Sequence, residues 1–209
     1  MPVFLNGDRN LLFVHVPKAG GTSMERMLRA SGWKMKFHAS RNSEPRTFPL
    51  RRCSPQHYHG TLLSEVFDLA AFELLFAIVR DPIARFRSEY LHQVRRLPEG
   101  IRTDAASVES WAEQAFAAYA ANPYVYDNHL RPQSEFLVEG LVVHRLEDGL
   151  EAATVDVERR LGHAIERDVP RGQHSVERAG VPSDAVEVSP KLEARLREFY
   201  AADYAAFGY

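Results

Sequence analysis

Residues 11–23 read LLFVHVPKAGGTS, an apolar run that leads into a turn with two adjacent glycines. From Leu11 to Val16 the run is almost continuously apolar, as a strand covered on both faces requires. A helical pattern follows from Ser23 to Ala30. This order predicts a loop that cradles an anion, because glycines let backbone N–H groups approach it and a helix N-terminus adds unpaired donors.

The turn also carries polar side chains suited to phosphate. Lys18 supplies a full positive charge, while Thr22 and Ser23 supply hydroxyl groups. The alternative is an ordinary turn in which Thr22 or Ser23 only caps the helix. In the nucleoside-triphosphatase loop the lysine directly precedes Ser or Thr, whereas Lys18 precedes both glycines. We therefore predict that this segment binds a phosphorylated nucleotide through a loop of another kind.

A second segment of the same plan reads FAIVRDPIARFRSEY over residues 76–90. Asp81 and Pro82 are a favourable cap and first residue for a helix that follows an apolar strand. Arg80 therefore stands at the carboxyl end of that strand, where α/β sheets bind their ligands. A guanidinium at such a position suits a phosphate through paired hydrogen bonds.

Ser88 follows less than two helical turns after the cap, so we expect it to donate to the same phosphate as Arg80. The alternative is that Arg80 pairs with Asp81 or Glu89 and that Ser88 is solvated. Anion sites at the ends of two strands suit a nucleotide that is phosphorylated at two places.

Strands alternate with helices along the remaining sequence. This order predicts an α/β fold, which we describe as a P-loop-like three-layer sandwich with a mainly parallel central sheet. At 209 residues we expect one domain over 1–209, since domains usually run about 100 to 200 residues. The expected strands cover 11–16, 57–63, 74–79 and 141–145; the expected helices cover 23–30, 82–96, 107–121, 150–161 and a last one opened by Ser189 and Pro190; the expected loops, which either cover a site or are exposed surface, cover 39–55 and 169–190.

The formal net charge of −2 is unevenly distributed. Through Arg102 there are 16 Lys and Arg against 9 Asp and Glu, and after it 10 against 19, so the two parts carry +7 and −9. A basic half indicates an anionic ligand, although two oppositely charged faces that keep a protein soluble explain it equally well.

Signals for export or membrane insertion are not found in the sequence. Residues 1–10 lack a basic segment followed by an apolar run, and no stretch approaches the roughly 18 to 20 apolar residues of a membrane span. Cys53 is the single cysteine and has no partner for an internal disulfide, which fits a reducing compartment. We expect a soluble, cytoplasmic protein.

Together the two phosphate segments resemble the sulfotransferases that use 3′-phosphoadenosine 5′-phosphosulfate (PAPS), particularly the carbohydrate-type branch that includes the uronosyl 2-O-sulfotransferases. The resemblance implies transfer of a sulfuryl group from PAPS to a hydroxyl of a saccharide or glycoconjugate, with adenosine 3′,5′-bisphosphate as product. No nucleic-acid partner is expected, and the oligomeric state is left open. Weaker similarity extends over residues 127–133, 145–148, 199–204 and 207–209.

The resemblance also assigns binding residues. The 5′-phosphosulfate is expected on Lys18, Ala19, Gly20, Gly21, Thr22 and Ser23, and the 3′-phosphate on Arg80 and Ser88. A C-terminal loop contact falls at residues 173–175, QHS, which lack the Arg-Lys-Gly pattern of the cytosolic small-molecule branch. His129, Arg131 and Gln133 either shape the acceptor pocket or only anchor their loop against the core.

A base for the acceptor hydroxyl is expected in the segment His57-Tyr-His59. In an extended backbone both imidazoles would share one face, and the 2-O-sulfotransferases have a similar His-x-His, so we favour His59 over His57. Glu65 is the local alternative, since many family members use a carboxylate. The pair could also be structural, or bind a metal with His38, but we expect no metal. Lys18 would stabilise charge on the leaving phosphate.

Two other residues are interpreted as bystanders: His15 as a packed strand residue, and Cys53. Two other functions share the first motif. One is a P-loop nucleotide kinase or nucleotidase, which the position of Lys18 disfavours. The other is a nucleotide-binding module that has lost catalysis.

Overall fold

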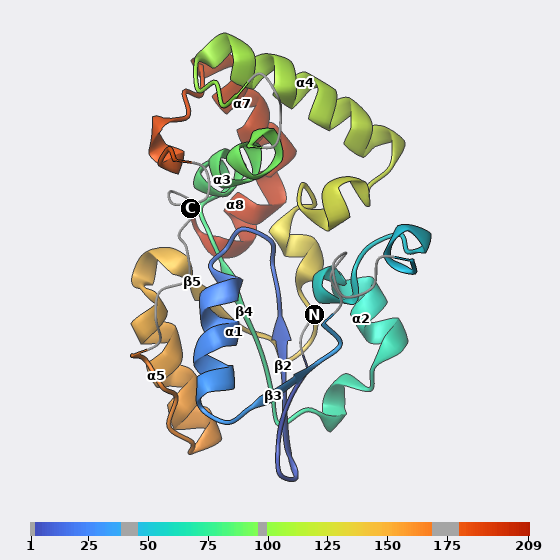
Figure 1. The fold of residues 1–209 in the computed structure, drawn as a ribbon, viewed down its shortest axis with the longest axis vertical. Helices are drawn as coiled ribbons and strands as arrows, with labels where there is room; N and C mark the ends of the chain where they lie inside the picture. Colours follow the sequence, from blue (N-terminus) through green and yellow to red (C-terminus); the bar gives the residue numbers. More distant parts are fainter. Residues whose placement is uncertain (1–2, 39–45, 96–99, 169–179) are drawn as a thin grey trace. The chain divides into compact units, whose positions relative to one another are not determined.

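The computed structural model describes residues 3–38, 46–95, 100–168 and 180–209 (Figure 1). The chain divides into two compact units, each made from two segments. The first, here called the sheet unit, comprises Met1–Val79 and Gln133–Pro170, and the second, the helical unit, comprises Arg80–Pro132 and Arg171–Tyr209. Each unit is described by itself, and a single domain over 1–209 stays a prediction.

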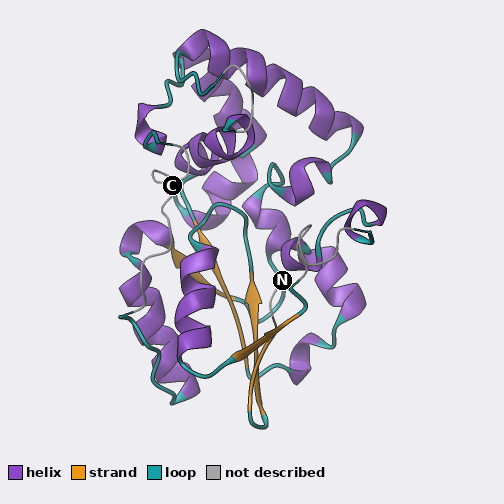
Figure 2. Cartoon of the chain, in the orientation of Figure 1, coloured by secondary structure: helices purple, strands orange, loops and turns teal. Residues whose placement is uncertain are grey.

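All five described strands belong to the sheet unit, whereas the described part of the helical unit has only helices and loops (Figure 2). The sheet has the order β3-β1-β2-β4-β5. Its parallel part consists of β2, β4 and β5, and β1 pairs antiparallel with β2 and β3. The prediction of parallel pairing is thus confirmed at the centre of the sheet. The strands span Val3–Asn6 (β1), Arg9–Val14 (β2), Lys34–Lys36 (β3), Leu74–Val79 (β4) and Val142–Arg145 (β5).

Helices α1 (Gly21–Ala30) and α5 (Leu150–Leu161) pack on one face of this sheet (Figure 1). Leu11 and Phe13 of β2 contribute to the core on that face, while the alternate residues Leu12 and Val14 are also buried. Burial on both faces explains why the run is continuously apolar, because alternate residues of a strand point to opposite faces. A full three-layer sandwich stays a prediction.

The expected strand at 57–63 is wrong. The chain instead forms a 3₁₀ turn, η2 (Pro55–His57), followed by helix α2 (Gly60–Val66). Leu63 is buried, whereas Leu62 is half-buried and residues 64–66 are exposed; the N–H of Leu63 donates to the carbonyl of His59 at 3.0 Å. A short helix that buries one apolar residue per turn is consistent with this pattern. The segment does not alternate between apolar and polar residues, as a half-buried strand would.

The other expected elements lie close to their predicted bounds. The bounds 74–79 and 150–161 are confirmed, while the helix expected at 23–30 begins two residues earlier. Residues 39–45 and 169–179 of the expected loops, including the expected contact at 173–175, lie outside the described residues.

The helical unit contains α3 (Pro82–Val94), α4 (Ala105–Ala121), α7 (Pro190–Phe199) and α8 (Ala201–Phe207). Both predicted caps are confirmed: the Asp81 carboxylate accepts from the N–H of Ala84 at 2.7 Å, and the Ser189 hydroxyl accepts from the N–H of Leu192 at 3.2 Å. The core between these helices is formed by Phe86, Tyr90, Leu91, Val108, Ala112, Phe116, Leu192, Leu196 and Tyr200.

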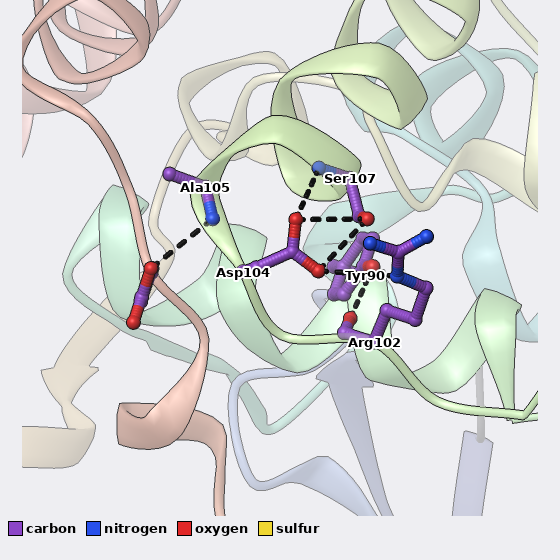
Figure 3. A network of polar contacts seen from close by, with 6 residues as sticks. Tyr90, Arg102, Asp104, Ala105 and Ser107 are labelled. Atoms are coloured by element: carbon purple, nitrogen blue, oxygen red, sulfur yellow. Dashed lines mark hydrogen bonds and ion pairs between the residues drawn. The ribbon is translucent and has the colours of Figure 1, made fainter.

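A polar network ties the start of α4 to α3 (Figure 3). The Tyr90 hydroxyl donates to the carbonyl of Arg102 at 2.5 Å, and the Asp104 carboxylate accepts from the N–H of Ser107 at 3.0 Å. The backbone hydrogen bond from Ser107 holds the pKa of Asp104 below its ordinary value. The N–H of Ala105 donates to the carboxylate of Glu187, so the C-terminal segment is held at the same place. Of the helices described, none has the length and apolar character needed to cross a membrane.

Candidate active site

The first phosphate motif forms a tight turn between β2 and α1. Its backbone is left-handed at Lys18 (φ 67°) and at Gly20 (φ 85°). Glycine adopts this conformation readily, but a lysine held there costs on the order of 1 kcal/mol. Such strain is typical of functional loops, and here it is located at the single cation of the motif.

Helix α1 starts without a side-chain cap. Its N-cap residue is Gly20, and no side chain accepts a hydrogen bond from the first turn. Thr22 and Ser23 lie within that turn and are exposed, so the alternative in which one of them caps the helix is wrong. The first turn also contains no acidic residue. Its N–H groups and the positive end of the helix dipole are therefore suited to an anion.

Gly21 is also required by packing, and Gly20 by its left-handed backbone. A Cβ on Gly21 would lie 2.7 Å from Cε1 of His15, and one on Gly20 would lie 2.9 Å from Cδ1 of Leu146. The turn is thus pressed against the end of β2 and against η6 (Leu146–Asp148). A side chain at position 21 would collide with the buried His15 ring, whereas one at position 20 would be strained by the backbone and would push the end of the Leu146 side chain aside.

His15 and Glu25 form a buried pair behind this turn. The imidazole Nδ1 lies 2.5 Å from the carboxylate Oε1, and the two residues are 5% and 6% exposed. Burial raises the pKa of Glu25, but the charge of His15 and its hydrogen bond outweigh this, so the pKa lies below its ordinary value. His15 is packed as predicted, but it also bonds Glu25, a buried residue that no pattern in the sequence singles out.

The expected base segment also lies in the sheet unit. His57 ends η2 and His59 stands at the N-cap of α2, and both are buried. The His57 ring packs edge-on against the ring of His15, with centroids 5.3 Å apart, and its Nδ1 lies 3.3 Å from the Ser54 hydroxyl. Glu65, the carboxylate alternative, is exposed on α2.

Helix α2 packs on η5 (Gln133–Phe136), which carries one of the three residues considered for the acceptor. A Cβ on Gly60 would lie only 2.5 Å from the carbonyl oxygen of Leu137, so this close approach needs glycine beside His59. Gln133 is fully buried. The sheet unit thus brings the segment of His59 and the turn of Gln133 together.

The second phosphate motif belongs to the helical unit. Arg80 follows β4 directly in the chain and is half-buried, while Asp81 caps α3. Ser88 is only 4% exposed, so the alternative in which it is a solvated surface residue is wrong. Its role toward a phosphate stays a prediction.

His129 and Arg131 lie in a loop of the helical unit, and side chains of the same unit hold this loop in place. The buried Arg85 guanidinium donates to the carbonyls of both residues at 2.7 Å. Nδ1 of His129 lies 2.7 Å from the Glu89 carboxylate, and Nε of Arg131 donates to Asn128 at 3.1 Å. These contacts support the anchoring alternative, and a role in acceptor binding stays a prediction.

An anion-type loop after one parallel strand, followed by an arginine directly after the neighbouring strand, is typical of α/β proteins that bind phosphorylated ligands at strand ends. A family model described as the sulfotransferase family matches residues 1–209. The chain therefore belongs to the sulfotransferase family. Neither the curated proteins nor the solved structures contain a match. Membership of a sulfotransferase family is thus confirmed, while the use of PAPS and the carbohydrate-type branch stay predictions.

Proposed function

We propose that this protein transfers a sulfuryl group from PAPS to a hydroxyl group of a carbohydrate. Family membership supports sulfuryl transfer in general. The observation that carries the donor assignment is the turn of the first motif, where a strained Lys18 precedes a helix that has no side-chain cap. A loop of this kind suits a phosphate or phosphosulfate group.

The donor would be held by the two motifs. Lys18 and the backbone and hydroxyl groups of residues 19–23 would bind its 5′-phosphosulfate end. Arg80 and Ser88 would bind its 3′-phosphate, since a guanidinium forms paired hydrogen bonds with phosphate. The exposed hydroxyls of Thr22 and Ser23 and the buried hydroxyl of Ser88 fit such a polyanion.

PAPS, when bound, supplies the sulfuryl group and a phosphate leaving group. The Lys18 ammonium would stabilise the negative charge that develops on that phosphate. His59 would take the proton of the acceptor hydroxyl, with His57 as the second candidate, because an imidazole accepts a proton at neutral pH. Both imidazoles are buried in the unit that holds Lys18.

The test compares two ligands and then a panel of acceptors. Calorimetric titration should show binding of adenosine 3′,5′-bisphosphate but not of ATP with Mg²⁺. Radiolabelled PAPS should then label a saccharide of the panel. Binding of ATP with Mg²⁺ alone would refute the proposal in favour of a kinase-like phosphotransferase. Binding of PAPS with no labelled acceptor of any class would favour a module without catalysis.

A further inference from the structure

A single carboxylate oxygen joins three segments of the sheet unit. Oε1 of Glu25, in the second turn of α1, lies 2.5 Å from Nδ1 of His15 at the end of β2. The same oxygen accepts from Nε2 of Gln56, in η2, at 3.3 Å. In the sequence, His15 lies just before the phosphate turn and Glu25 just after it. Gln56 directly precedes His57.

The charge state of the pair defines how His15 is oriented. Because the pKa of Glu25 lies below its ordinary value, the carboxylate is ionised at neutral pH and Nδ1 of His15 carries the hydrogen of their bond. A buried carboxylate that accepts from one ring nitrogen fixes the rotation of an imidazole. The Glu25–His15 bond is the one hydrogen bond of the His15 side chain among the described residues.

The fixed ring in turn contacts both segments of the candidate site. Three atoms of the His15 ring lie 2.7–2.9 Å from where a Cβ of Gly21 would stand, so the ring supports the first residue of α1. The ring also packs against the rings of Phe13 in β2, with centroids 5.7 Å apart, and of His57, at an interplanar angle of 68°. A displacement of His15 must therefore move the phosphate turn and the base segment together, since close-packed groups cannot shift alone.

We propose that Glu25 and His15 are positioning residues that keep the phosphate turn and the His57–His59 segment in a fixed position relative to each other. The His15 ring fixes the position of the turn through its contact with Gly21. Glu25 fixes the orientation of His15 and, through Gln56, the position of the base segment. Neither residue touches the reacting atoms. The expected effect on the rate of sulfuryl transfer rests on the proposed function. The structural coupling between the two segments does not.

The first experiment therefore uses no donor. Amide hydrogen exchange is measured on the full chain for residues 18–23 and 54–60 in wild type, Glu25→Ala, Gln56→Ala and Glu151→Ala, an exposed control on α5. Glu25→Ala should accelerate exchange about tenfold in both segments, as expected for the loss of a hydrogen bond to a charged group. Gln56→Ala should accelerate only 54–60, and Glu151→Ala neither. Unchanged exchange in 54–60 for both site variants would overturn the coupling.

The second experiment separates positioning from simple loss of structure. Affinity for adenosine 3′,5′-bisphosphate and the rate of its release from PAPS, with water as acceptor, are measured for the same variants. Gln56→Ala should keep its affinity within about twofold while the rate falls about tenfold. Glu25→Gln, which keeps the shape and can bond both neighbours, should recover most of the activity lost in Glu25→Ala.

Equal losses of affinity and rate in Gln56→Ala would overturn the positioning role. Wild-type affinity and rate in both Gln56→Ala and Glu25→Ala would also overturn it. If Glu25→Ala does not fold, Gln56→Ala and Glu25→Gln decide the question. A wild-type protein that binds no adenosine 3′,5′-bisphosphate would instead refute the proposed function, while the exchange experiment still decides whether the segments are coupled.

Discussion

The His15 imidazole fills the space that a side chain on residue 21 would occupy. A Cβ on Gly21 would lie 2.7 Å from Cε1 and 2.8 Å from Nε2 of His15, closer than carbon atoms in contact. His15 cannot easily move away, since it is buried and bonded to Glu25. The second glycine of the motif is therefore determined by its neighbour in the fold as well as by any anion.

Gly21→Ala should lower the free energy of unfolding by about 1 to 3 kcal/mol, the usual cost of overpacking a buried site. Urea denaturation measures this value. In a His15→Ala background the same change should cost clearly less, because the clash is gone. Equal costs in the two backgrounds would contradict the assignment of the ring as the obstacle.

Lys18→Met removes the charge of the first motif while keeping the length of the side chain. The rate of sulfuryl transfer should fall about 10²- to 10³-fold, as expected when a group that stabilises transition-state charge is lost. Steady-state kinetics with PAPS measures this. Lys34→Met, on the exposed edge strand β3, is the matched control and should behave as wild type. Equal rates for the two variants would exclude the role of Lys18.

Arg80→Ala should weaken binding of adenosine 3′,5′-bisphosphate about 10- to 100-fold, the cost of losing charged hydrogen bonds. Its affinity for adenosine 5′-phosphate, which lacks the 3′-phosphate, should not change. Calorimetry with both ligands measures the two constants. A similar loss for both would show that Arg80 acts on folding and not on the 3′-phosphate.

His59→Ala should lower the transfer rate about 10²- to 10⁴-fold, the usual contribution of a general base. Affinity for adenosine 3′,5′-bisphosphate should stay near the wild-type value. His163→Ala, which removes a ring packed on Trp33 in the same unit, controls for the loss of a histidine. An unchanged rate in His59→Ala, with a loss in His57→Ala or Glu65→Gln, would transfer the role of base to that residue.

Glu25 should make stability depend on pH in the acid range. Its pKa lies below the ordinary value of 4.5, so its stabilising effect is complete above pH 4.5 and is lost as the pH falls through the folded-state value. The difference in unfolding free energy between wild type and Glu25→Gln should therefore shrink below pH 4.5. Urea denaturation between neutral pH and about pH 3 measures it. A difference between wild type and Glu25→Gln that stays constant over this pH range would refute the ionised pair.

Local interactions explain the features that were predicted well. The bounds of β4 and α5 follow from apolar patterning, and the starts of α3 and α7 follow from Asp81 and Ser189. A cap acts within about three residues and a buried strand needs only its own apolar run, so both are visible in a short window.

Non-local pairing explains what was missed. Strands β1 and β3 are short, and β3 is recognised only through its antiparallel register with β1, which pairs Val3 with Lys36. The segment at 57–63 resembles a strand when it is considered alone, because its helix depends on packing against η5, more than 60 residues later in the chain. Short apolar runs do not distinguish the two structures by themselves.

The amino-acid sequence by itself determined the order of strand, turn and helix, and the chemical types placed at the turn: Lys18, the two glycines and the two hydroxyls. These depend on neighbours along the chain. Only the tertiary structure decided that Gly21 lies on His15 and that one oxygen of Glu25 reaches both His15 and Gln56. Residues 15, 25 and 56 have no common spacing, and they meet only because α1 folds back along β2 and η2 packs beside both.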